Sequence, residues 1–101
     1  VIVSNNDQVL LPVSVSLYPN PVAFSQQQNL EFCFQNLKNQ SAEIAIYNLK
    51  GQKVHSYKLL DGDSYRWNGK DHIGQRSAAG IYFIKVQVQG ESPITRKLII
   101  L

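Results

Sequence analysis

The chain has 101 residues, which is enough for one domain with one hydrophobic core. Charged residues make up only 17% of the sequence, and the net charge is +3. The Lys and Arg residues are dispersed along the chain, whereas a nucleic-acid-binding protein needs a concentrated basic patch. No apolar stretch is long enough to span a membrane as a helix. The totals therefore argue against a nucleic-acid partner and against a membrane-spanning segment.

The beginning of the chain differs from the rest. The sequence contains no methionine, so Val1 is not a translation start, and we expect the chain to be part of a longer protein. Residues 1–12 have no regular pattern, and their polar centre predicts a linker from a preceding domain, although residues 9–11 could add a short edge strand. We therefore predict a linker over residues 1–12 and a single folded domain over residues 13–101.

Apolar and polar residues alternate repeatedly from residue 13 onward, and no helical pattern of convincing length appears. This period-two pattern is typical of half-buried strands in antiparallel sheets. It recurs over residues 13–18, 30–35, 43–47, 54–59, 65–67, 82–89 and 97–101. About seven short strands at this spacing predict an all-β fold, an immunoglobulin-like antiparallel β-sandwich.

Turn-forming residues separate these runs. Pro19, Asn20 and Pro21 should stop the first strand, because neither proline can donate a hydrogen bond to a sheet. Gly51 lies between the third and fourth runs, where a hairpin favours a positive φ. Gly69 follows Asn68 in a further turn signal. We assign these residues a structural role.

The sequence offers no catalytic or metal-binding constellation. His55 is expected to face solvent from a strand, and it has no second His or Cys at metal-ligand spacing. Asp61 and Asp63 form a close carboxylate pair, but a calcium site needs six or more oxygens, so an acidic turn is the better interpretation. Cys33, the single cysteine, cannot form an internal disulfide and has no evident general base, so it is interpreted as a passive thiol. We predict no enzymatic activity, no metal and no cofactor.

Trp67 is the single tryptophan, and it stands in a short strand before an Asn-Gly turn. We interpret it as a buried anchor at one end of the sandwich. A carbohydrate-binding role would require further exposed aromatic residues on one face. Tyr47, Tyr57, Tyr65 and Phe83 are the candidates, so an accessory module that binds carbohydrate or packs on a catalytic domain remains the alternative.

Five stretches match one family pattern in the correct order. They are residues 18–21 (Tyr-Pro-Asn-Pro), 46–54 (Ile-Tyr-Asn-Leu-Lys-Gly-Gln-Lys-Val), 67–75 (Trp-Asn-Gly-Lys-Asp-His-Ile-Gly-Gln), 80–83 (Gly-Ile-Tyr-Phe) and 97–101 (Lys-Leu-Ile-Ile-Leu). The set resembles the C-terminal sorting domain of the type IX (Por) secretion system. The Trp-Asn-Gly and Gly-Ile-Tyr pieces also resemble the immunoglobulin-like domain of flagellar hook-capping proteins, which supports the fold.

The resemblance implies a non-catalytic tag on a cargo protein that crosses the periplasm and reaches the cell surface or the medium. The implied partners are the outer-membrane translocon, its processing machinery and an N-terminal cargo domain. The resemblance carries a recognition role onto Gly80, Tyr82, Lys97 and Leu101. The residue types suggest structural roles as well: a tight start to a strand at Gly80, a buried ring with a bonded hydroxyl at Tyr82, and a charge that discourages edge-to-edge aggregation at Lys97.

Overall fold

The computed structural model describes residues 12–37, 40–60 and 64–101. Its strands are short, as expected where turn residues interrupt each alternating run. The elements in chain order are β1 (Ser14–Tyr18), the 3-10 turn η1 (Phe24–Gln26), β2 (Leu30–Gln35), β3 (Ala42–Asn48), β4 (Lys53–Leu59), β5 (Tyr65–Trp67), β6 (Gly80–Val88) and β7 (Ile94–Ile100). The predicted all-β fold is confirmed, and the last strand begins three residues earlier than the sequence indicated.

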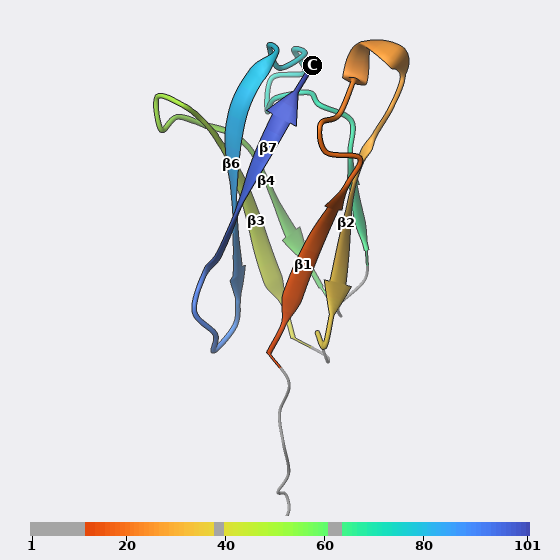
Figure 1. Ribbon diagram of the computed structural model, residues 1–101. Coiled ribbons are helices and arrows are strands. Elements are labelled where there is room, and N and C mark those ends of the chain that lie inside the picture. The colour runs from red at the N-terminus through yellow and green to blue at the C-terminus, as the bar shows by residue number, and fades with distance from the viewer. Residues whose placement is uncertain (1–11, 38–39, 61–63) are drawn as a thin grey trace, which may run out of the picture.

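Two antiparallel sheets face each other to form the β-sandwich (Figure 1). The smaller sheet has the strand order β1-β2-β5, and the larger has the order β4-β3-β6-β7. Both the third and the seventh strand pair with β6, which makes β6 a central strand. The core lies between the sheets and is filled by the inward residue of each alternating pair, among them Leu30, Phe32, Ile44, Ile84 and Leu98, all fully buried.

Trp67 is 1% exposed, which confirms its prediction as a core anchor. Its ring packs edge-on against Phe24 with 5.2 Å between the ring centroids. The indole N–H donates to the backbone oxygen of Lys70 at 2.9 Å. The only polar atom of the indole is therefore satisfied inside the core, as a buried tryptophan requires.

Gly69 allows the Asn-Gly turn to pass over Phe24. A Cβ atom at residue 69 would lie 2.5 Å from the Phe24 ring, and the residue has a φ of +85°. Both sterics and backbone conformation therefore demand glycine at this position. Gly51 also has a positive φ, of +82°, but space around it is open, so only the conformation favours glycine there.

Two turns share one hydrogen-bond pattern. Oδ1 of Asn48 accepts from the N–H of Lys50 and of Gln52, and Oδ1 of Asp71 accepts from the N–H two and four residues later. Short polar side chains stabilise such turns because their oxygen accepts hydrogen bonds in place of a backbone oxygen. Each turn also exposes one large apolar side chain, Leu49 in the first and Ile73 in the second.

His55 faces the interior, so its predicted solvent-facing position is wrong. Its imidazole lies parallel to the ring of Trp67, and its Nε2 lies 2.6 Å from the Tyr65 hydroxyl. The reason is the register of β4 with β3, because His55 pairs with the fully buried Ile46 and shares its face with the buried Leu59. The β-bulge between Ile46 and Tyr47 affects only the residues of β4 that precede His55.

His55 belongs to an aromatic cluster that joins β4 to β5. Tyr57 and Tyr65 stack with 4.0 Å between their ring centroids. Burial lowers the pKa of His55 below 6.5, and the nearby His72 adds to the shift. Burial, and the neighbouring Tyr57, raise the pKa of Tyr65 above 10.0. The cluster therefore holds a neutral imidazole beside a neutral phenol at neutral pH.

Several sequence predictions concern residues outside the described part. Residues 1–11 of the linker predicted over residues 1–12 lie there, including the possible edge strand at residues 9–11, and so do Asp61 and Asp63. Among the residues that are described, no group of three or more His, Cys, Asp or Glu side chains could hold a metal ion. The same residues contain no helix with the length and hydropathy needed to cross a membrane.

Candidate recognition corner of the sheet

Strands β6 and β7 bring Gly80, Tyr82 and Leu101 to one corner of the molecule, with Lys97 three cross-strand pairs from the end of β7. The register pairs Gly80 with Ile100 and Tyr82 with Leu98, so the start of β6 lies beside the end of β7. Leu101 follows directly, and this end of the sheet also carries the β3–β4 turn (Figure 1). Residues that are about twenty positions apart in the chain thus share one site through antiparallel pairing.

Gly80 begins β6 in a conformation that other residues rarely adopt, with a φ of +147°. A Cβ atom there would meet no neighbour within 4 Å, so the fold itself leaves space at this position. Gly80 lines a surface hollow of about 240 Å³ together with Leu49, Ile81 and Tyr82. Glycine at residue 80 is therefore favoured by the backbone conformation and not by contact with a neighbour.

Tyr82 confirms the expected combination of a buried ring and a bonded hydroxyl. The residue is 6% exposed, and its hydroxyl donates to the backbone oxygen of Ala78 at 2.6 Å. Burial raises the pKa of Tyr82 above 10.0. Tyr82 therefore anchors the segment before β6 to the core and fixes the wall of the hollow.

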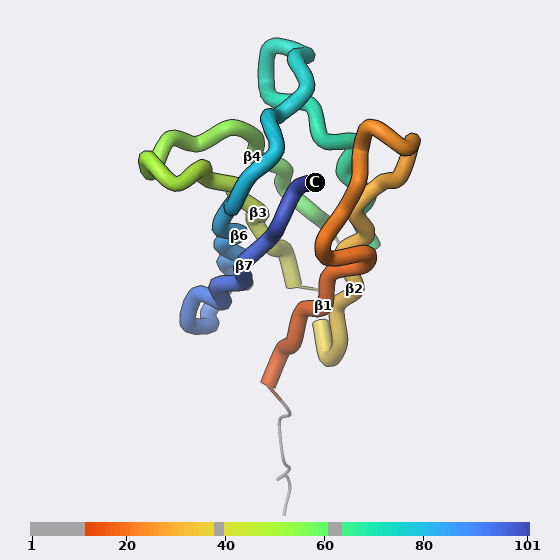
Figure 2. Tube along the Cα trace, turned by 45° about the horizontal axis from the view of Figure 1, so that its top comes forward, coloured from red at the N-terminus to blue at the C-terminus, as the bar shows by residue number. Residues whose placement is uncertain are grey.

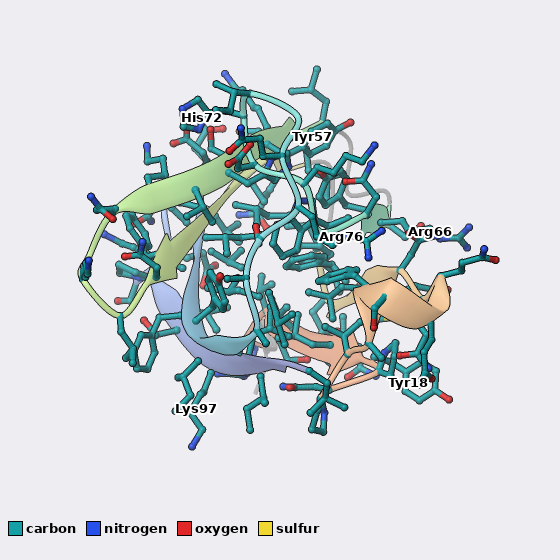
Figure 3. The ribbon with its side chains drawn as sticks, turned by 90° about the horizontal axis from the view of Figure 1, so that it is seen from above. Tyr18, Tyr57, Arg66, His72, Arg76 and Lys97 are labelled. Carbon is teal, nitrogen blue, oxygen red and sulfur yellow. The ribbon has the colours of Figure 1, made fainter. Side chains whose placement is uncertain are left out.

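Lys97 and Leu101 are exposed. Lys97 extends from β7 away from the body of the sandwich (Figure 3), and its partner across the sheet is Phe83. Leu101 is 64% exposed, although its N–H donates to the backbone oxygen of Val22 at 2.9 Å. The backbone of the last residue is thus held while its side chain remains free of the core.

The sequence predicted only a turn at Asn20, and the structure shows a second role for this residue. Its Nδ2 donates to the backbone oxygen of Lys97 at 2.8 Å, and its Oδ1 accepts from the N–H of Ile99 at 3.1 Å. The carboxamide thereby takes the place of a neighbouring strand along the outer edge of β7. The adjacent Val22 continues this pairing, because its N–H donates to the oxygen of Ile99 at 2.9 Å. We call residues 20–22 the edge clamp.

The edge clamp determines which groups of β7 are accessible to a partner. An unpaired strand edge offers a row of backbone groups to which another chain can add. The clamp satisfies these groups from Lys97 to Leu101, while β6 pairs with the other edge. A partner that added a strand along this segment would first have to displace Asn20 and Val22. Side chains are therefore the accessible features of β7 at this corner.

Comparison with protein-family models gives one match, over residues 16–101, to the secretion system C-terminal sorting domain. The chain belongs to this family. The domain is therefore a type IX secretion sorting domain, whose family is non-catalytic and whose members are delivered to the cell surface or the extracellular space. A search of curated protein sequences found no match.

Two solved structures from Porphyromonas gingivalis share the fold of this sorting domain. One is PorZ, described as an essential bacterial surface component of the type-IX secretion system, with a TM-score of 0.68 and 18% identity over 86% of this chain. The other is dimeric latent PorU, with a TM-score of 0.68 and 19% identity over 88% of this chain. The chain spans only 11% and 9% of their lengths.

Proposed function

We propose that this domain, over residues 13–101, carries an N-terminal cargo domain through the periplasm to the outer-membrane translocon and its processing machinery. We further propose that the translocon reads the corner formed by Gly80, Tyr82, Lys97 and Leu101. The observation that supports this assignment is the β6–β7 register, which places Gly80, Tyr82 and Leu101 at one end of the larger sheet and Lys97 three cross-strand pairs further along.

The four residues have different roles in this proposal. Tyr82 is buried and bonded, so it holds the corner in shape, whereas Gly80 supplies the positive φ with which β6 begins beside the hollow. Lys97 and Leu101 are exposed and offer one cation and one apolar side chain to a receptor. A receptor that used both would gain apolar contact and charge complementarity at a single point, which favours specificity.

The position of the cargo is compatible with this assignment. β1 starts at the end of the sandwich opposite to the C-terminus (Figure 1), and the tube view from a different angle shows the same separation (Figure 2). A domain that precedes β1 would therefore lie away from the corner. The corner would stay accessible while the cargo is folded.

The test is a fluorescent reporter fused ahead of residues 1–101 and expressed in a bacterium with a type IX system. A short polar tail added after Leu101 should leave the melting temperature unchanged, because the Leu101 side chain is already outside the core. Export should nevertheless fail, because the tail obstructs the corner. Normal melting together with normal export would show that the free end is not read.

Lys97→Ala tests the side chain in the same assay. Lys70→Ala is its matched control, because both lysines are exposed and Lys70 lies outside the corner. Each change should alter the free energy of unfolding by less than about 0.5 kcal/mol. Reduced export for Lys97→Ala alone supports recognition of the ammonium group, and equal export for both variants contradicts it.

A further inference from the structure

The outer face of the larger sheet carries one continuous row of four side chains. The register pairs Lys53 with Tyr47, Tyr47 with Phe83, and Phe83 with Lys97. Cross-strand partners share one face of a sheet, so this row crosses all four strands of β4-β3-β6-β7 with two aromatic rings between two lysines. Phe83 is 39% exposed even though it lies on a central strand.

Apolar side chains extend the row toward the recognition corner. Ile81 and Ile99 are partners in the next row, and Ile81 is 38% exposed. Ile81 also lines the hollow at Gly80, so the face and the corner form one surface. A contiguous exposed apolar patch with a charged rim is typical of an interaction site.

The charges on this face have one predominant sign. Lys85 lies opposite Ala45 and Thr95, adjacent to the aromatic pair, and adds a third cation to Lys53 and Lys97. Glu43 is the acidic residue of β3, and its cross-strand partner is Lys58, which offsets its charge. The aromatic row is therefore surrounded by cations that have no acidic partner among the residues paired with them.

We infer that the outer face of β4-β3-β6-β7 docks onto a protein surface in which Asp or Glu side chains surround an apolar ridge. The inference rests on the proposed function and extends it from the corner to a whole face. Charge complementarity selects this occupant, because each cation requires an anion opposite it when water is removed. A second copy of the chain does not fit, since face-to-face pairing would place lysines against lysines.

Export of the reporter fusion tests the face without altering Gly80, Tyr82, Lys97 or Leu101. Lys53→Gln with Lys85→Gln changes the net charge from +3 to +1, which is 3 − 2. Lys70→Gln with Arg76→Gln makes the same change away from the face and serves as the control. We expect about tenfold slower export for the first pair, because steering by charge changes association rates at least this much. All variants should keep the melting temperature of the parent chain.

Equal export by both pairs and the parent chain would overturn the docking face while leaving the sorting function intact. Equal loss by both pairs would show an effect of net charge alone and would also overturn it. Failure of the parent chain itself to export the reporter would overturn the proposed function and the inference that rests on it.

Cross-linking identifies the partner that docks onto the outer face of β4-β3-β6-β7. Cys33 is exposed on β2 of the smaller sheet, which gives a natural attachment point on the opposite face. Cys33→Ser with Thr95→Cys moves this point to the docking face. With a photoactivatable maleimide and the detergent-solubilised translocon as probe, we expect cross-links from residue 95 to an acidic protein segment and none from Cys33.

The same probe separates a protein partner from an anionic membrane. Binding should be lost at about 1 M salt, where the Debye length is about 3 Å. Binding to phosphatidylglycerol vesicles that equals binding to the translocon would overturn the protein occupant. Cross-links of equal yield from both faces would overturn the assignment of the surface.

Discussion

The two seams at which the sheets meet are closed by different forces. At one seam, the edge clamp binds β7 through hydrogen bonds from Asn20 and Val22 to the backbone. At the other seam, β4 meets β5 through stacked rings, with His55 and Tyr57 against Tyr65 and Trp67. The polar seam satisfies a strand edge, whereas the aromatic seam removes large apolar surfaces from water.

The difference has an energetic consequence. The hydrogen bonds of Asn20 are exposed and contribute little net free energy, because water can replace them. The aromatic seam includes Trp67, which is 1% exposed and cannot leave its place without exposing the core. Removing the carboxamide of Asn20 should therefore cost less than removing the Trp67 ring, because Val22, Leu98 and Ile100 remain buried at the polar seam.

Breaking the aromatic seam should have the largest effect. Trp67→Ala removes a side chain that is 1% exposed and deletes its contacts with Phe24 and His55. We expect the free energy of unfolding to fall by roughly 3–5 kcal/mol. Chemical denaturation followed by circular dichroism measures it. Indole fluorescence typical of full exposure in the folded parent domain would contradict the burial on which this prediction depends.

Gly69→Ala disturbs the packing next to the same seam. The new Cβ atom would lie 2.5 Å from the Phe24 ring in a backbone with a φ of +85°. Strain of this kind costs about 1–3 kcal/mol. Gly51→Ala is the matched control, since its φ is similar but its surroundings are open. The difference between the two melting temperatures isolates the contact with Phe24, and equal losses would show that the contact is relieved.

Asn20→Ala breaks the polar seam. Removal of the carboxamide leaves the oxygen of Lys97 and the N–H of Ile99 to water, and the expected cost is about 1 kcal/mol. Amide hydrogen exchange at Ile99 should accelerate more than exchange in β3. Asn20→Asp keeps the acceptor for Ile99 but loses the donor to Lys97, so it should restore only part of the protection. Unchanged exchange at Ile99 would show that Val22 alone holds the edge.

The smallest expected effect is the dependence of the free energy of unfolding on pH, which tests the aromatic seam. Burial lowers the pKa of His55 in the folded state, so the unfolded state binds a proton more readily. The free energy of unfolding should therefore decrease as the pH falls through 6.5 and should level off below the folded-state pKa. His55→Phe should flatten this dependence, which thermal melting between pH 7.5 and about 4.5 can measure. An identical decrease in the variant would assign the effect to other groups.

The sequence predicted the strands, the core anchor at Trp67 and the bonded hydroxyl of Tyr82. These features depend on local alternation, on turn residues such as Pro19 and Gly69, and on the chemistry of single side chains. A strand of period two reveals its buried face without knowledge of its neighbours. The ordered family motifs further identified the sorting domain and named the residues of its corner.

The inward orientation of His55, the edge clamp and the basic aromatic row needed the tertiary structure. His55 points inward because it pairs with the buried Ile46, and alternation within one strand cannot reveal its register with another. Asn20 lies 77 residues before Lys97, and the row from Lys53 to Lys97 exists only because four strands align. The sequence determined which faces of each strand are apolar, and strand pairing decided which side chains meet.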